Sequence, residues 1–319
     1  MSSMSSILVV HNPRSHRGAK VFAIMKRWLR GAGLAQSVEF VEVTELKNAS
    51  LPTERLVVSG GDGTINSALE WFYRKKGDAP VGFLPAGTGN CLAAEFGLLK
   101  DYSRLCEIAF RGTARRPLDV LTYQVPAEEL PRLILQSSCF GLPANVGLTY
   151  ERLRQNWRHR MLFRMLGNSS YNMLAMFEIR AQRMRERRGE PVLNVKVAFP
   201  PEEGHPDFEG DVLAMFIQNE AGTGGNLVPC PLARVDDGLM DICIFRASTG
   251  HSYIKMLGKL GKGRHLEDEE VVSYYQSKGP LRVSLSFSQP FSADGDIWLE
   301  SDEFDFAIEP RRFEILVEE

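Results

Sequence analysis

The stretch VVSGGDGTINSALE, residues 57 to 70, decides the fold of the N-terminal part of this 319-residue chain. Two β-branched residues end a buried strand, a turn with three glycines follows, and an amphipathic helical segment begins without a spacer. Such a turn lets bare backbone N–H groups and a helix N-terminus hold a phosphate group. Asp62 is unusual there, because a carboxylate repels phosphate unless it binds Mg²⁺, accepts a hydrogen bond or takes a proton. The alternative is a tight turn whose Asp62 only caps the helix.

A second turn of the same design follows at PAGTGN, residues 85 to 90. Its glycines accompany Thr88 and Asn90, two neutral side chains that form hydrogen bonds. One glycine-rich turn is a weak signal, but two at the same edge of a parallel sheet can grip both ends of a nucleotide. The pair therefore predicts a nucleotide site.

Strands and helices alternate through the first third of the chain. Residues 6–10, 37–43, 55–58 and 80–84 read as strands, and residues 18–29, 64–76 and 90–97 read as helices. In this prediction Thr64 caps the helix after the first glycine-rich turn. Alternation of this kind predicts an open parallel sheet with right-handed crossovers, here an α/β nucleotide-binding domain over residues 1–117.

From Leu118 onward, short alternating segments separated by turn signals such as DDG, SKGP and SADG dominate. They predict a mainly antiparallel β-sandwich domain over residues 118–319, interrupted by helical stretches at 148–188 and 251–260. The last strand, RFEILVEE, needs a partner, which either the first strands of this region or the first domain supplies.

Composition narrows the function classes. The formal net charge of −2 gives no global attraction to nucleic acid, so no nucleic-acid partner is expected. Five cysteines without CxxC spacing are typical of reduced thiols, and the N-terminus lacks the pattern of a signal peptide. No apolar run reaches the length of a membrane span. We expect a cytoplasmic protein whose contact with lipid is peripheral. The sequence leaves open whether the protein forms a homodimer.

Several motifs together resemble the catalytic domain of diacylglycerol kinases and their relatives, the soluble bacterial lipid kinases, sphingosine kinases and ceramide kinases. They are GGDGT followed by PAGTGN, NPRS at residues 12–15, QN at 218–219 with GG at 224–225, PLARVDDGLMD at 231–241, and DGD at 294–296. The match extends over nearly the whole chain. GGDGT alone is shared with NAD kinases.

The resemblance implies an ATP site, a structural Mg²⁺ and a proton acceptor. Asp237 and backbone carbonyls near Arg234 and Leu239 would hold the Mg²⁺. The proton acceptor would be Asp296, as proposed for bacterial members, or Asp62, as discussed for sphingosine kinases. The implied nucleotide contacts are Asn12, Thr44, Gly60, Gly61, Asp62, Gly63, Thr64, Asn66, Gly87, Thr88 and Asn90.

The expected activity is ATP-dependent transfer of the γ-phosphate to a lipid hydroxyl, with diacylglycerol as the first choice of acceptor. A sphingoid base or ceramide is the nearest alternative, and a soluble acceptor such as NAD defines a rival enzyme class. Cys91 and His16 stand where the family commonly has Asp and Gly. These two departures motivate a third alternative, a lipid- or nucleotide-binding module with impaired catalysis.

Residues 151–190 contain ten arginines and four glutamates, a local charge of +6. Leu153, Trp157, Met161 and Met165 recur at every fourth residue among these arginines. A basic helix with an aromatic and methionine stripe suits docking on an anionic membrane. The alternative is a helix that packs on its own domain and exposes a solvated arginine face.

Overall fold

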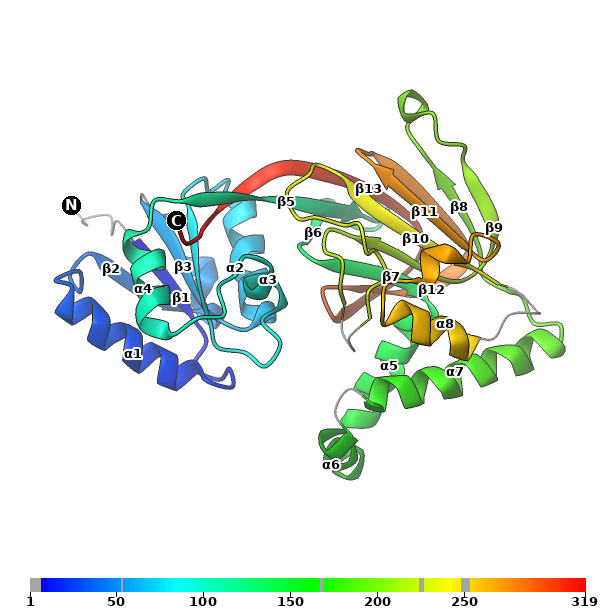
Figure 1. Cartoon of the computed structure of the whole chain (residues 1–319), viewed down its shortest axis with the longest axis horizontal. Helices are drawn as coiled ribbons and strands as arrows, with labels where there is room; N and C mark the ends of the chain where they lie inside the picture. The colour runs from blue at the N-terminus through cyan, green and yellow to red at the C-terminus, as the bar shows by residue number, and fades with distance from the viewer. Residues whose placement is uncertain (1–6, 53, 167–168, 224–226, 248–252) are drawn as a thin grey trace. The chain divides into compact units, whose positions relative to one another are not determined.

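The computed structural model describes residues 7–52, 54–166, 169–223, 227–247 and 253–319 (Figure 1). The chain forms two compact units. Unit 1 comprises the residues up to Asp119 together with Arg311–Glu319, and unit 2 comprises Val120–Pro310. Among the described residues, no helix has the length and hydropathy needed to cross a membrane.

Unit 1 is built on a parallel sheet. Its strands lie in the order β13, β4, β3, β1, β2, and the C-terminal end of β13 joins β4 through the pair Ile315 and Val81. The chain thus returns at its end to the unit in which it began. The strands are β1 (Ile7–His11), β2 (Val38–Glu42), β3 (Arg55–Gly60), β4 (Val81–Pro85) and β13 (Asp296–Leu316).

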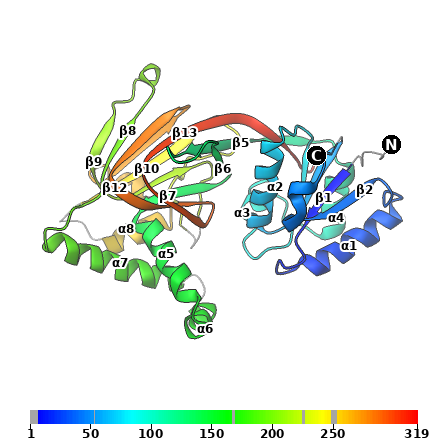
Figure 2. The same ribbon diagram turned by 180° about the vertical axis from the view of Figure 1, so that it is seen from behind.

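Helices cover both faces of this sheet. Figures 1 and 2 show α1 (Gly18–Gly31) and α4 (Tyr102–Arg111) on one face and α2 (Asp62–Arg74) on the other. Each buries an apolar stripe, which in α1 consists of Val21, Met25 and Leu29. The expected α/β layer is present, with the short helices η1 (Val43–Asn48) and α3 (Cys91–Glu95) after β2 and β4.

Unit 2 is mainly antiparallel. Its sheet runs in the order β11, β10, β9, β7, β12, β13, while β8 pairs with both β9 and β12 and β5 pairs with β6. The β-sandwich predicted for this half of the chain is confirmed. The strands are β5 (Arg115–Gln124), β6 (Arg132–Ile134), β7 (Ser137–Gly141), β8 (Asn194–Ala198), β9 (Phe208–Gln218), β10 (Met240–Arg246), β11 (Val272–Ser277) and β12 (Leu281–Ala293).

The sheet of unit 2 has apolar residues on both faces. Along β9, Met215 and Ile217 belong to the sandwich core, where Phe140 packs on Phe291 with ring centroids 4.8 Å apart. Phe216 points to the opposite face and joins a second core under the helices. These strands are therefore buried on both faces.

Helices α5 (Leu142–Arg154), α7 (Ser169–Arg187) and α8 (Tyr253–Leu260) cover the second face of this sheet, and α6 (Trp157–Leu166) extends away from it (Figures 1 and 2). The sequence predicted one helical stretch over 148–188. Instead, α5 ends before Asn156, whose side-chain oxygen accepts the Arg158 N–H (3.0 Å) and starts a new helix.

Candidate functional site

The segments that follow β1, β3 and β4 meet at one edge of the unit 1 sheet. The Asn12 N–H donates to the Ser59 carbonyl (3.0 Å) and the Ala86 N–H donates to the Gly60 carbonyl (2.6 Å). The sheet thus brings the two glycine-rich turns side by side, as parallel strands place their carboxyl ends together.

Close backbone contact between the two turns requires glycine. A Cβ on Gly87 would lie 2.6 Å from the Gly61 Cα, and a Cβ on Gly61 would lie 3.0 Å from the Gly87 Cα. A Cβ on Gly89 would lie 2.8 Å from the Asp62 Oδ2. The absence of a Cβ at these glycines therefore allows the two turns to lie in contact.

Asp62 joins the two turns. Its Oδ2 accepts the Asn90 N–H at 2.7 Å, and its buried Oδ1 has no hydrogen-bond partner among the described residues. Asn90 has left-handed backbone angles (φ 58°, ψ 42°), and its side chain closes the second turn through bonds to the Gly87 N–H and carbonyl. The unpartnered Oδ1 can accept a hydrogen bond from a ligand or contact a cation.

The helix after the first turn starts earlier than expected. α2 begins at Asp62 with Gly61 as its N-cap, so the prediction that Thr64 caps it is wrong. Thr64 is instead buried, and its Oγ1 accepts a hydrogen bond from the Asn12 Nδ2 (3.1 Å). This bond links the NPRS motif to the first glycine-rich turn. Asn66 follows on α2, and its buried Oδ1 lacks a described partner.

The start of α2 fits a phosphate group. The first N–H groups of a helix have no carbonyl partner within it, and in α2 these include the amides of Asp62 and Gly63. A Cβ on exposed Gly63 would meet nothing within 4 Å, so space lies beside these donors. Bare amides with open space beside them are what anion binding at a helix N-terminus needs.

The other predicted nucleotide contacts lie around this centre. Thr88 is exposed between Gly87 and Gly89 in the second turn. Thr44 is exposed on η1, which follows β2. In the sheet, β1 and β3 lie between β2 and β4. Both remain predictions as ATP contacts. Exposed Cys91 begins α3 directly after Asn90.

Asp294 and Gly295 form the turn between β12 and β13 in unit 2, and Asp296 is the first residue of β13. Asp294 (φ 51°) and Gly295 (φ 86°) both have positive φ, as in a type I′ hairpin turn. The Asp294 carboxylate accepts the N–H groups of Leu135 (2.8 Å), Gln136 (2.9 Å) and Ser137 (3.0 Å). These three bonds make Asp294 a structural anchor, whereas Asp296 is exposed.

Arg234, Asp237 and Leu239 lie in one loop before β10. The exposed Asp237 accepts the Leu239 N–H through Oδ1 (3.1 Å), and Gly238 between them has φ of 74°. One carboxylate and two backbone carbonyls are hard oxygen donors that suit Mg²⁺. No group of three or more His, Cys, Asp or Glu side chains in the described parts of the chain could hold a metal. The Mg²⁺ site at this loop stays a prediction, resting on one carboxylate and backbone carbonyls.

An apolar cavity of about 210 Å³ lies inside unit 2, and residue-by-residue reading of the sequence did not predict it. It runs between the sheet and helices α5, α7 and α8, and Gly295 in the β12–β13 turn is one of its lining residues. Ser137 and Ser292 also line it, close to the anchored Asp294. Its apolar wall includes Leu142, Val146, Ile179, Phe245, Met256 and Leu260.

Comparison with known proteins identifies both halves of the chain. Residues 6–123 match the diacylglycerol kinase catalytic domain, and residues 163–317 match the YegS C-terminal NAD kinase beta sandwich-like domain. A solved diacylglycerol kinase structure from Bacillus anthracis aligns with a TM-score of 0.66 at 13% identity, over 100% of this chain and 98% of that one. This likeness shows the same fold.

Curated relatives carry kinase names. A Pseudomonas aeruginosa protein named "Probable lipid kinase YegS-like" is 28% identical over 80% of this chain and 74% of its own length. A Mycobacterium tuberculosis protein named "Diacylglycerol kinase" is 26% identical over 84% of this chain and 82% of its own length. Together with the two matched domains, these relatives show that the chain belongs to the lipid kinase family built on the diacylglycerol kinase catalytic domain.

Proposed function

We propose that the protein transfers the γ-phosphate of ATP to the hydroxyl of a membrane lipid, with diacylglycerol as the acceptor. The single observation that carries the choice of a lipid acceptor is the apolar cavity of unit 2, whose lining includes Gly295, the residue next to Asp296. An apolar space beside an exposed carboxylate suits a lipid whose chain is buried and whose hydroxyl faces that carboxylate. A soluble acceptor such as NAD would need a polar pocket instead.

In this proposal the residues of unit 1 bind and orient the nucleotide. The amides of Asp62 and Gly63 would hold phosphate oxygens, and Thr88 and Thr44 would contact the rest of the nucleotide. Asp62 would use Oδ1, since Oδ2 is already bonded to the Asn90 amide. Phosphoryl transfer depends on positioning and on stabilisation of developing charge more than on covalent help.

Asp296 is the proposed proton acceptor. Its neighbour Asp294 is fixed by three backbone amides, so the turn that carries Asp296 is held rigidly against the start of β7. General-base assistance of this kind contributes about 10²–10⁴-fold to rate. Mg²⁺ bound by Asp237 and the carbonyls of Arg234 and Leu239 would supply positive charge and order that loop.

We also propose that α6 and α7 dock on an anionic bilayer. Trp157 (64% exposed), Met161 (61%), Met165 (78%) and Phe177 (63%) expose apolar side chains on these helices. The surrounding segment 151–190 has a charge of +6, which complements anionic lipid. Leu153, in contrast, belongs to α5 and packs against the core under the helices.

The test is transfer of labelled phosphate from ATP and Mg²⁺ to lipid in mixed micelles. Diacylglycerol, ceramide, sphingosine and NAD are supplied separately at equal concentration. The proposal expects diacylglycerol to give the highest kcat/KM and NAD to give none above background. Preference for ceramide or sphingosine would change the acceptor within the class, and phosphorylation of NAD alone would overturn the lipid assignment.

Two variants separate binding from chemistry in the same assay. Asp296→Asn should lower kcat by about 10²-fold or more with little change in the KM for ATP, as expected for loss of a general base. Val146→Trp should fill the apolar cavity and raise the KM for diacylglycerol while ATP binding is retained. Unchanged kcat in Asp296→Asn would leave Asp62 as the remaining candidate base.

A further inference from the structure

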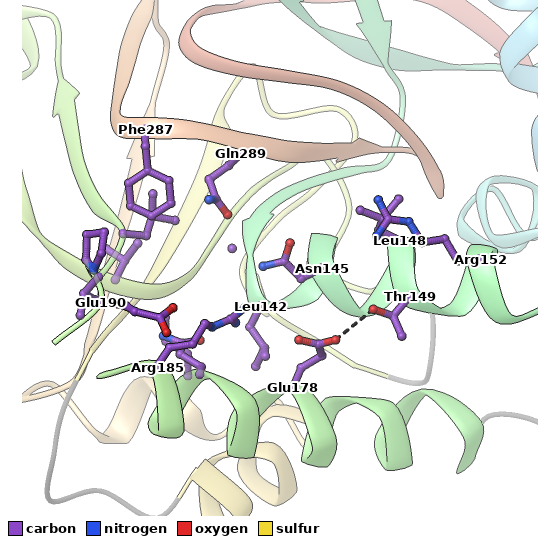
Figure 3. Close-up of a pocket in the computed structure, with 17 residues that line it drawn as sticks. Leu142, Asn145, Leu148, Thr149, Arg152, Glu178, Arg185, Glu190, Phe287 and Gln289 are labelled. Carbon is purple, nitrogen blue, oxygen red and sulfur yellow. Dashed lines mark hydrogen bonds between the residues drawn. The ribbon is translucent and has the colours of Figure 1, made fainter. Parts of the chain in front are cut away.

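A second cavity in unit 2, of about 390 Å³, differs in character from the apolar one. It lies between one face of α5, the C-terminal half of α7, the chain that leads into β8, and strand β12. Leu142 and Leu213 line both cavities and so form part of the wall between them. Figure 3 shows Asn145 reaching from α5 and Gln289 from β12 toward this space.

The facing surfaces of the two helices are polar where they line this cavity. Asn145, Thr149 and Arg152 follow one face of α5, and Glu178, Gln182 and Arg185 follow one face of α7. Thr149, Glu178 and Gln182 are half-buried in this lining, whereas Arg152, Arg185 and Glu190 are exposed to solvent. The cavity therefore offers half-buried polar groups and exposed charges to a small polar molecule.

Side chains of both charges line the cavity. Arg152, Arg185, Glu178 and Glu190 line it, yet among the described ion pairs none joins either arginine to either glutamate. Glu178 is oriented through Oε1, which accepts the Thr149 hydroxyl at 2.9 Å (dashed line in Figure 3). Two arginines and two glutamates around one cavity are complementary to a molecule that carries both charges.

We propose that this cavity binds a small zwitterion of the phosphoethanolamine type. The guanidinium of Arg185 or Arg152 would pair with the phosphate, since its planar fork matches phosphate oxygens. Glu178 and Glu190 would accept hydrogen bonds from the ammonium group, and Asn145 and Gln289 would bind remaining oxygens. The cavity volume lies within the range of small-molecule sites. The same chemistry occurs in a free metabolite and in the headgroup of a zwitterionic phospholipid.

Binding is measured without ATP or acceptor, so the result is independent of the kinase assignment. Calorimetry with phosphoethanolamine tests the free molecule, and sedimentation with phosphatidylcholine vesicles, with and without phosphatidylethanolamine, tests the headgroup. The full chain should bind at least one of these probes in saturable fashion. Ethanolamine alone and inorganic phosphate alone should each bind at least tenfold more weakly than phosphoethanolamine.

Variants locate the site. Arg185→Gln and Glu178→Gln should each weaken binding at least tenfold, with unchanged far-ultraviolet circular dichroism and melting temperature. Arg180→Gln is the matched control, because Arg180 is an exposed arginine of α7 that does not line the cavity. Binding to neither probe would overturn the proposal, as would equal loss in Arg185→Gln and Arg180→Gln. Tight binding of phosphate alone would show a plain anion site and would also overturn it.

Discussion

Asp62 is the residue whose substitution tests the site most cleanly. Asp62→Asn keeps an oxygen that can accept the Asn90 N–H but removes the carboxylate charge beside the proposed phosphate site. We expect at least a 10²-fold loss of kcat in the micelle assay, with a melting temperature within a few degrees of the wild type. Near-normal turnover in a variant that melts normally would exclude Asp62 from the reaction.

Gly87 tests the contact between the two turns. In Gly87→Ala the new Cβ would lie 2.6 Å from the Gly61 Cα, so one backbone segment must move. We expect a loss of about 1–3 kcal/mol in the free energy of unfolding and at least tenfold weaker ATP binding by calorimetry. Gly31→Ala is the matched control, since a Cβ there meets nothing within 4 Å. Equal unfolding free energies and equal ATP affinities in the two variants would show that the turns tolerate separation.

His265 gives a pH dependence whose sign is fixed. It is fully buried, and burial lowers its pKa from the usual value even though its Nε2 donates to the Pro229 carbonyl (2.9 Å). As the pH falls through about 6.5, the unfolded chain therefore binds more protons than the folded chain does. The free energy of unfolding decreases in that range. Between pH 7.5 and 5.5, urea unfolding should show a smaller loss of the free energy of unfolding in His265→Gln than in the wild type. His16→Gln, at an exposed position, should retain the wild-type loss.

At the scale of elements, α6 is the helix whose exposed side chains call for a partner. Trp157→Gln combined with Met165→Gln removes two apolar side chains that are more than half exposed, so stability should be unaffected. We expect at least tenfold weaker binding to anionic vesicles, measured by co-sedimentation. Insertion of apolar side chains and arginine contacts with lipid headgroups act together in this binding. Leu232→Gln, also at an exposed leucine, should bind like the wild type. Binding unchanged in the double variant would exclude α6 as the docking element.

The elements show where sequence patterns suffice. The alternation of strands and glycine-rich turns predicted β1, β3, β4 and the edge at which Gly61 meets Gly87, because those signals are local. The division between α5 and α6 was missed, since a single side chain, Asn156, redirects the chain within an otherwise helical pattern. The pairing of β11 with β10 could not be predicted, because local sequence does not determine which segments pair.

At the scale of the molecule, the sequence indicated two domains. It did not indicate which side chains of unit 2 come together. Asp294 belongs to the DGD motif at residues 294–296, and the motif does not show that Asp294 has a structural role. Its bonds to the amides of residues 135–137 depend on pairing of β12 with β7, which sequence spacing does not reveal. The two cavities of unit 2 likewise arise from helices packed on a sheet, and they supply the chemical basis for the proposed ligands.

A crystal structure of the protein with a non-hydrolysable ATP analogue and Mg²⁺ would test the proposed nucleotide site directly. We expect triphosphate oxygens within hydrogen-bond distance of the amides of Asp62 and Gly63, with the second glycine-rich turn against the same nucleotide. A nucleotide bound away from both turns would contradict this expectation.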